Sequence, residues 1–147
     1  MIYKIIKKDL FDMVYEDYYF LAHCVNATYE LGAGIAKTFD EKYNMKYLLR
    51  SKFPQPKNDE AYYVGKALLI GITFNLVTKV KHWHKPTYEN LHKALEDMRR
   101  QCEEYGIKKL AMPKIGCGLD RLSWDEVESI IFDVFNDCDI EIVICYL

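Results

Sequence analysis

The sequence predicts a three-layer α/β/α sandwich built around a mixed, roughly six-stranded sheet. Short strand-like runs alternate with helical patterns along the chain, which favours helices packed on both faces of a sheet. Hydrophobic residues make up 50% of the 147 residues, enough for one sizeable core. In addition, two glycine-containing segments each follow an apolar run and lead into a helical pattern. We therefore expect a single domain over residues 1–147.

Six runs rich in aliphatic, β-branched and aromatic residues predict the strands. Two of these runs flank Gly71 and are expected to form a hairpin. The stretch 53–60 contains two prolines and several polar residues, so it is expected to be a surface loop. The predicted strands cover residues 3–6, 19–25, 63–70, 73–78, 108–112 and 140–147.

Four segments show the periodicity of helices. The longest begins after Thr87, whose hydroxyl suits an N-cap, and it repeats apolar residues at helical spacing as far as Tyr105. Ser123 is placed to cap the last helix in the same way. The predicted helices cover residues 34–43, 45–51, 88–105 and 123–135.

The composition restricts the possible functions. The chain has 20 basic and 22 acidic residues, so no broad basic field for non-specific nucleic-acid binding is expected. A local basic patch is formed by Lys79, Lys81, His82 and His84. Five cysteines without a Cys-x-x-Cys pair predict a reduced, cytosolic protein with neither disulfides nor zinc. The apolar runs are too short for a signal peptide or a membrane span, and no membrane partner is expected.

The two glycine-containing segments are candidate phosphate-binding loops. Residues 31–36 read Leu-Gly-Ala-Gly-Ile-Ala and follow the apolar run that ends at Asn26. Residues 112–121 read Met-Pro-Lys-Ile-Gly-Cys-Gly-Leu-Asp-Arg and precede the last predicted helix. Glycine lets the backbone approach an anion, and free N–H groups at a helix start point toward it. Two such loops in one small domain indicate a ligand with two phosphates.

Both loops resemble the phosphate-binding loops of macrodomains, the ADP-ribose-binding family. The likeness is strongest to the terminal ADP-ribose protein glycohydrolase subgroup, with a relation to the DNA ADP-ribosyl glycohydrolase antitoxin macrodomains. His-Lys-Pro-Thr-Tyr-Glu-Asn-Leu at 84–91 and Ile-Gly-Cys-Gly-Leu-Asp-Arg-Leu at 115–122 are the most specific segments. The similar segments are residues 8–11, 22–24, 32–36, 78–79, 84–91 and 113–122, with Trp124.

The resemblance implies how ADP-ribose would lie. The adenine would be near Asp9, the pyrophosphate between the two glycine loops, and the distal ribose near Asn26. The C-terminal strand would bring Leu147 close to the adenine. The residues implied to bind ADP-ribose are Asp9, Leu10, Asn26, Gly32, Ala33, Gly34, Ile35, Ile115, Gly116, Cys117, Gly118, Leu119 and Leu147.

The resemblance also implies a catalytic pair. Lys79 would attack the anomeric carbon of the terminal ribose, and Asp120 would act as acid and base. Lys81 is the alternative nucleophile, because Lys-His-Trp at 81–83 is similar to a motif of the DNA ADP-ribosyl glycohydrolase relatives. The implied activity is an ADP-ribosyl hydrolase without cofactor or metal. Its substrates would be an aspartate or glutamate ester on protein, O-acyl-ADP-ribose, or an ADP-ribosylated DNA base.

Two alternatives remain from the sequence. A non-catalytic ADP-ribose reader would use the same fold and loops, since fold does not decide function. A phosphatase acting on ADP-ribose-1''-phosphate would use the same pocket. The chain also departs from the family at Lys8, where glycine is usual, and in the Gly-Ala-Gly of residues 32–34, where many relatives have three glycines. Cys117 is expected to pack in its loop rather than to act as a nucleophile, and the protein is expected to be a monomer.

Overall fold

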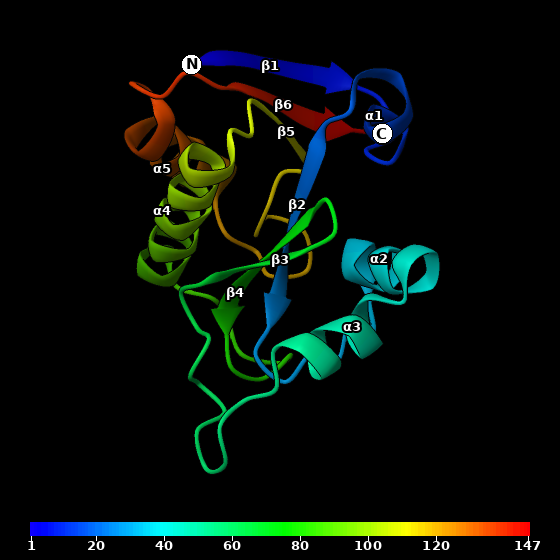
Figure 1. Ribbon diagram of the computed structural model, residues 1–147. Helices are drawn as coiled ribbons and strands as arrows, with labels where there is room; N and C mark the ends of the chain where they lie inside the picture. The colour runs from blue at the N-terminus through cyan, green and yellow to red at the C-terminus, as the bar shows by residue number, and fades with distance from the viewer.

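The computed structural model describes residues 1–15 and 17–147 and contains a six-stranded sheet (Figure 1). The strands are β1 (Ile2–Lys7), β2 (Phe20–Asn26), β3 (Ala67–Ile70), β4 (Thr73–Lys79), β5 (Lys109–Met112) and β6 (Glu141–Tyr146). Their order across the sheet is β1-β6-β5-β2-β4-β3. All neighbours pair in parallel except β3 and β4, which form the predicted antiparallel hairpin at Gly71. The predicted mixed sheet is therefore confirmed.

Helices cover both faces of this sheet, which confirms the predicted three layers. Figure 1 shows α4 and α5 on one side and α2 and α3 on the other. The helices are α1 (Asp12–Asp17), α2 (Gly34–Tyr43), α3 (Met45–Lys52), α4 (Tyr88–Tyr105) and α5 (Trp124–Phe135). As predicted, Thr87 caps α4, because its hydroxyl accepts a hydrogen bond from the Asn90 N–H at 3.1 Å.

Alternate side chains of the strands point into two separate cores. In β6, Ile142 and Ile144 pack against α4 and α5, whereas Val143 packs toward α2 and α3. In β2, Ala22 and Leu21 divide in the same way. Because central parallel strands are buried on both faces, they read in the sequence as continuous apolar runs. This is why the strands were recognisable without strict alternation of polar and apolar residues.

The structure differs from the sequence predictions in three places. The strand expected at 63–70 begins only at Ala67, because the chain turns through residues 61–65 and Gly65 adopts a left-handed φ of +84°. The helix α1 was not predicted, and its six residues are too few for a helical period to stand out. Ser123 occupies the N-cap of α5 but its side chain makes no capping hydrogen bond; its N–H donates to the Tyr88 hydroxyl at 3.0 Å.

Side chains of α4 bind the backbone at the start of the edge strand β3. The Ala67 N–H donates to Asp97 Oδ2 at 2.8 Å, and Gln101 Nε2 donates to the Ala67 carbonyl at 2.7 Å. Asp97 is itself held by Arg100 at 2.9 Å. The backbone groups of Ala67 that are not used within the sheet are thus satisfied inside the chain.

His23 lies in the centre of the sheet and is fully buried. Its Nε2 is 2.6 Å from Asn75 Oδ1, and its ring stacks on Phe39 with centroids 3.8 Å apart. Burial lowers the pKa of His23 from its usual 6.5 to about 4, although the Asn75 hydrogen bond opposes this effect. The folded protein therefore holds His23 neutral under conditions in which the unfolded chain protonates it.

Acidification is expected to destabilise the fold through His23. Between pH 6.5 and 4 the unfolded chain binds a proton that the folded state does not, so the free energy of unfolding falls as the pH decreases. From pH 7.5 to pH 5 the loss should be roughly 2 kcal/mol. Urea denaturation of the wild type and His23→Gln at several pH values would measure it. Equal pH slopes for the two proteins would contradict this assignment.

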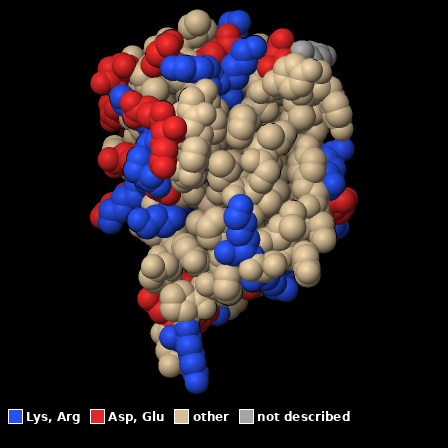
Figure 2. Space-filling view, in the orientation of Figure 1, with Lys and Arg blue, Asp and Glu red and all other residues tan. Residues whose placement is uncertain are grey.

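The surface carries charges of both signs rather than a basic field. On the face shown in Figure 2, acidic and basic side chains intermix toward the left, where Figure 1 places α4. Arg99 and Glu103 form one of the ion pairs along that helix, at 3.1 Å. None of the helices in the described ranges combines the length and hydropathy needed to cross a bilayer.

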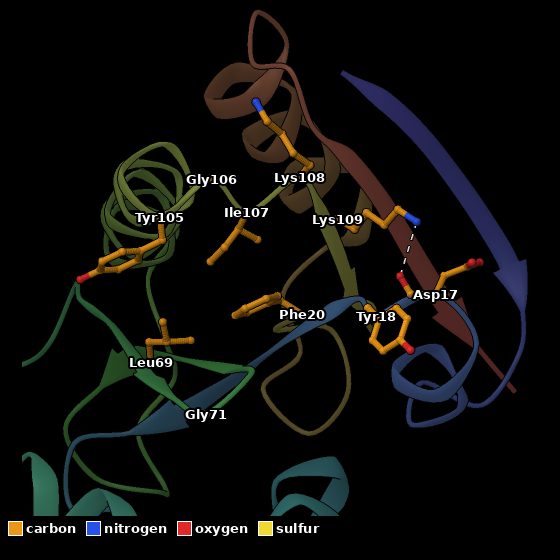
Figure 3. Close-up of a pocket in the computed structure, with 10 residues that line it drawn as sticks. All are labelled: Asp17, Tyr18, Phe20, Leu69, Gly71, Tyr105, Gly106, Ile107, Lys108 and Lys109. Atoms are coloured by element: carbon orange, nitrogen blue, oxygen red, sulfur yellow. Dashed lines mark hydrogen bonds between the residues drawn. The ribbon is translucent and has the colours of Figure 1, made fainter.

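Two surface cavities lie away from the predicted site residues. One, of about 560 Å³, is lined by Phe20, Leu69 and Ile107, with Tyr18 and Tyr105 at its sides (Figure 3). The other, of about 710 Å³, lies along β3 and the facing side of α4. The first cavity is formed by the amino-terminal ends of β2 and β5 together with the β3–β4 turn, so it opens at the opposite edge of the sheet from the predicted site.

Candidate active site

The parallel strands bring the predicted site residues to one edge of the sheet. Asn26 is the last residue of β2 and Lys79 is the last residue of β4, and the two are register partners across the strand pair. The second glycine loop, 113–122, follows β5, which neighbours β2 on its other side. Ligands of open α/β sheets bind at the carboxyl ends of strands. The central position of β2 therefore places both glycine loops around one site.

The ion pair between Lys79 and Asp120 is the central feature of this site. Lys79 Nζ lies 2.5 Å from Asp120 Oδ1 and also donates to the His82 carbonyl at 2.9 Å. Only 12% of the Lys79 side chain and 18% of the Asp120 side chain are exposed. The two residues are 41 positions apart, and they meet because one ends a strand and the other lies in the neighbouring glycine loop. The amine is thus held next to a carboxylate that can accept its proton.

Lys81 is directed to a different partner. Its Nζ lies 2.5 Å from Glu60 Oε2 in the loop before β3. The backbone N–H of Lys81 donates to His84 Nδ1 at 3.2 Å, which closes the turn of this loop. Trp83, which lies between Lys81 and His84 in the sequence, is 68% exposed. Of the two candidate nucleophiles, Lys79 is therefore the one in contact with Asp120.

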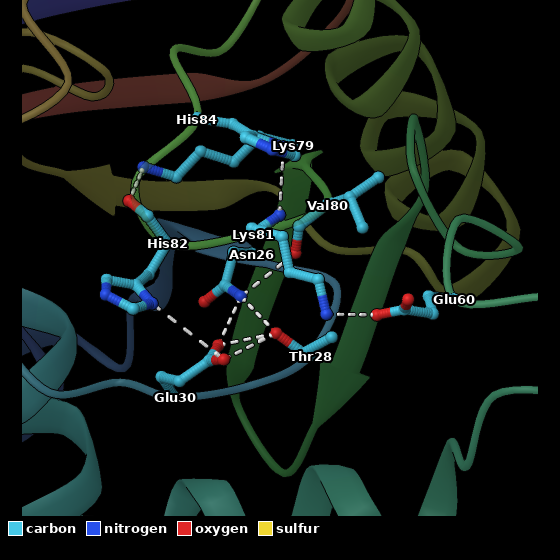
Figure 4. A network of polar contacts seen from close by, with 9 residues as sticks. All are labelled: Asn26, Thr28, Glu30, Glu60, Lys79, Val80, Lys81, His82 and His84. Carbon is cyan, nitrogen blue, oxygen red and sulfur yellow. Dashed lines mark hydrogen bonds and ion pairs between the residues drawn. The ribbon is translucent and has the colours of Figure 1, made fainter.

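A polar network joins Asn26 to the loop that follows it (Figure 4). Asn26 Nδ2 donates to Thr28 Oγ1 at 2.8 Å and to the Val80 carbonyl at 3.0 Å, and it also donates to Glu30. The Thr28 hydroxyl donates to the Glu30 carboxylate. His82 Nδ1 lies 3.9 Å from Glu30 Oε1. Asn26, which is only 5% exposed, is thus fixed between β4 and its own loop.

The loop between β2 and α2 has a constrained backbone. Tyr29 and Leu31 both adopt left-handed φ angles, 54° and 45°, and both side chains are buried. Such angles are uncommon outside glycine and are found where surrounding contacts enforce them. Here the Tyr29 hydroxyl donates to the Phe53 carbonyl at 2.8 Å, which ties the loop to the end of α3.

The first glycine loop presents the start of α2. The N-cap residue Ala33 is extended and provides no side-chain cap, so the first N–H groups of the helix have no capping side chain. Gly34 has a φ of +60°, and Gly32 is exposed with open space around the position of a β-carbon. The Ile35 side chain packs against the core that includes Phe39. This helix start matches the geometry of an anion site.

The second glycine loop faces the first. Leu119, 73% exposed, has a methyl carbon 3.3 Å from where a β-carbon on Gly34 would lie. Gly116 has a φ of +73°, and its missing β-carbon would come within 2.8 Å of Leu122. Glycine is therefore required at position 116 by both conformation and space. Gly118 is exposed, and nothing lies within 4 Å of where a β-carbon on it would be.

The residues predicted to lie near the adenine follow β1 and β6, at the same carboxyl ends of the parallel strands. The Lys8 N–H donates to the Tyr146 carbonyl at 2.9 Å, so the last residues of the chain run beside Asp9. Asp9 Oδ1 accepts from the Phe11 N–H at 2.9 Å. Leu147 is exposed, whereas Leu10 is buried in the core. Ile115, in the second glycine loop, is buried as well.

The two cysteines near the site are poor nucleophiles. Burial raises the pKa of Cys24 to about 12, with a further contribution from the negative charge of Asp120. Burial also raises the pKa of Cys117, whose thiol donates to the Ile115 carbonyl at 3.3 Å. Both thiols are therefore protonated at neutral pH, which agrees with the expected packing role of Cys117.

Sequence reasoning missed three contributors to this site. Glu30 and Thr28 look like ordinary polar loop residues, and nothing in their spacing distinguishes them. The His82 carbonyl that accepts from Lys79 belongs to the main chain, so no residue type could reveal it. Only the proximity of residues 26–30 to a strand end indicated that this segment would face a ligand.

An α/β sandwich with two facing glycine loops at the carboxyl ends of parallel strands is the architecture expected of a domain that binds a phosphorylated ligand. The family model described as "Macro domain" matches residues 22–131, so the chain belongs to the macro domain family. It is 40% identical over 142 residues to the human (Homo sapiens) protein named ADP-ribose glycohydrolase OARD1, covering 95% of this chain and 88% of that relative.

More distant relatives have the same fold. A protein of Mycobacterium tuberculosis named DNA ADP-ribosyl glycohydrolase is 28% identical over 143 residues, which cover 90% of this chain but only 40% of that protein. The solved structure of the macrodomain of Mycobacterium tuberculosis DarG superposes with a TM-score of 0.81 at 21% identity, covering 99% of this chain and 98% of that one. The resemblance inferred from the sequence is thereby confirmed.

Proposed function

We propose that this macro domain is an ADP-ribosyl hydrolase that binds ADP-ribose and removes it from modified macromolecules. The contact between Lys79 and Asp120 is the observation that carries this proposal, because ADP-ribose binding alone needs no such pair. The similarity to a relative named ADP-ribose glycohydrolase supports it. The pyrophosphate would lie between residues 32–35 and 116–118, and the adenine near Asp9.

The chemistry follows from the geometry of the pair. Asp120 takes a proton from Lys79 along the 2.5 Å contact, and the free amine attacks the anomeric carbon of the distal ribose. The bond from that carbon to the carboxylate of the modified side chain breaks, and the carboxylate leaves with the bonding electrons. Asp120 then releases its proton to solvent and takes one from the water that adds to the lysyl-ribose carbon. The carbon–nitrogen bond breaks, and Asp120 returns that proton to the lysine amine. The products are free ADP-ribose and the regenerated lysine.

The covalent intermediate can be tested directly by intact mass spectrometry. After incubation with excess ADP-ribose and borohydride reduction, the denatured protein should carry the mass of ADP-ribose less one oxygen atom. The added mass should be absent from Lys79→Ala and present in Lys81→Ala. An adduct lost only in Lys81→Ala would move the nucleophile to Lys81. Tight reversible binding without any adduct or turnover would favour the non-catalytic reader.

The substrate can be identified by comparing release of ADP-ribose from four compounds. These are glutamate-linked ADP-ribosyl protein, O-acetyl-ADP-ribose, ADP-ribosylated DNA and ADP-ribose-1''-phosphate. We expect turnover of at least one of the first three through Lys79. Exclusive turnover of the phosphorylated compound would identify a phosphatase instead.

A further inference from the structure

The two ends of the Asn26 amide have different surroundings. Its nitrogen donates to Thr28, Val80 and Glu30 (Figure 4). Its oxygen accepts no hydrogen bond from any residue within 1–15 and 17–147, and it keeps some solvent-accessible area. Asn26 as a whole is 95% removed from solvent. A largely buried side chain thus keeps one acceptor atom without a donor from the described residues.

The neighbours of Asn26 dictate this orientation. The Val80 carbonyl and the Glu30 carboxylate can only accept hydrogen bonds. Thr28 gives its hydroxyl proton to Glu30, at 2.7 and 2.6 Å from the two carboxylate oxygens, so its own oxygen is left to accept from Asn26. Three acceptors therefore surround one end of the amide. A rotated amide would place its oxygen against the Glu30 carboxylate and remove the donor that the Val80 carbonyl and the Thr28 oxygen share.

The Glu30 carboxylate is ionised at neutral pH. Burial alone would raise the pKa of Glu30, but the hydrogen bonds from Thr28 and Asn26 outweigh it and lower the pKa. Glu30 also faces His82, 3.9 Å away, and no other charged group within the described residues forms an ion pair with it. The carboxylate is therefore a permanent acceptor beside Asn26.

We propose that Glu30 is a positioning residue: acting directly and through Thr28, it fixes the Asn26 amide so that the oxygen accepts a hydrogen bond from a hydroxyl of the distal ribose. This inference rests on the proposed function, because it concerns the sugar carried beyond the pyrophosphate. It predicts that the Glu30 carboxylate, acting through Asn26, raises the affinity for ADP-ribose relative to ADP, which lacks that sugar.

Calorimetric titration with ADP-ribose and with ADP tests this assignment. In Glu30→Ala the affinity for ADP-ribose should fall about three- to tenfold, the range of one lost hydrogen bond, while the affinity for ADP stays the same. Glu30→Gln keeps an acceptor oxygen for Asn26 and should restore most of the preference. Combining Glu30→Ala with Asn26→Ala should weaken ADP-ribose binding no further than Asn26→Ala alone, because Glu30 acts through Asn26.

Glu60→Ala is the matched control. Glu60 is a carboxylate in the same region, paired with Lys81 at 2.5 Å, and none of its contacts involves Asn26, so its removal should leave the preference unchanged. Equal weakening of ADP and ADP-ribose in Glu30→Ala would indicate a general distortion of the loop and overturn the inference. So would an unchanged preference. A wild-type protein that binds neither nucleotide would overturn the proposed function, and the inference with it.

Discussion

Replacing Lys79 with alanine is expected to lower kcat by at least about a thousandfold, because the attacking amine is lost. Affinity for ADP-ribose should stay within about tenfold, since a catalytic amine contributes mainly to the transition state. Single-turnover hydrolysis and calorimetric titration measure the two quantities separately.

Lys79→Arg separates charge from nucleophilicity. A guanidinium keeps the positive charge beside Asp120 but does not lose its proton at neutral pH, so this variant should also be inactive. Lys81→Ala is the control for removal of a neighbouring cation, and it should retain most of the activity because Lys81 pairs with Glu60 instead. Full activity in Lys79→Ala would show that this lysine is not the nucleophile.

Introducing a carboxylate into the second glycine loop should have the next largest effect. Gly118→Glu is expected to weaken ADP-ribose binding roughly thirtyfold, because about 2 kcal/mol of repulsion from the pyrophosphate is expected at a partly exposed site. The fold should tolerate the substitution, since nothing lies within 4 Å of an added β-carbon at Gly118. Titration at low salt measures the change.

Gly118→Gln has the same size without the charge and should lose much less affinity. The difference between the two variants should shrink as salt is added, because exposed charges are screened. If Gly118→Glu and Gly118→Gln bound ADP-ribose equally well, the charge of this side chain would not reach the phosphates. Equal binding by both variants and the wild type would remove Gly118 from the phosphate site.

The elements with long or buried apolar patterns could be predicted from the sequence. The helix over residues 88–105 was predicted with its cap, because Thr87 and the spacing of Leu91 and Leu95 act locally. The start of β3 was not, because Tyr63 and Val64 have the composition of a strand but lie in a turn, where Tyr63 packs edge to face against Phe53 with ring centroids 5.8 Å apart. Tertiary packing overrode β propensity there.

The candidate site was only partly predictable for a related reason. Lys79 and Asp120 each lie beside a strand end, and the family resemblance supplied their roles. Their contact could then be confirmed by a single distance. Glu30 was missed because its approach to Asn26 depends on the left-handed backbone at Tyr29, which local sequence does not encode. Such long-range constraints on loops appear only once the whole chain is folded.

The binding of α4 side chains at the start of β3 has a consequence for the behaviour of the protein at high concentration. An exposed sheet edge is a template on which a second chain can add a strand and begin aggregation. At Ala67 the two groups that such a strand would need are already taken by Asp97 and Gln101. This edge is also only four residues long. The helix thus makes Ala67, at the start of this edge, unavailable for pairing with a second chain.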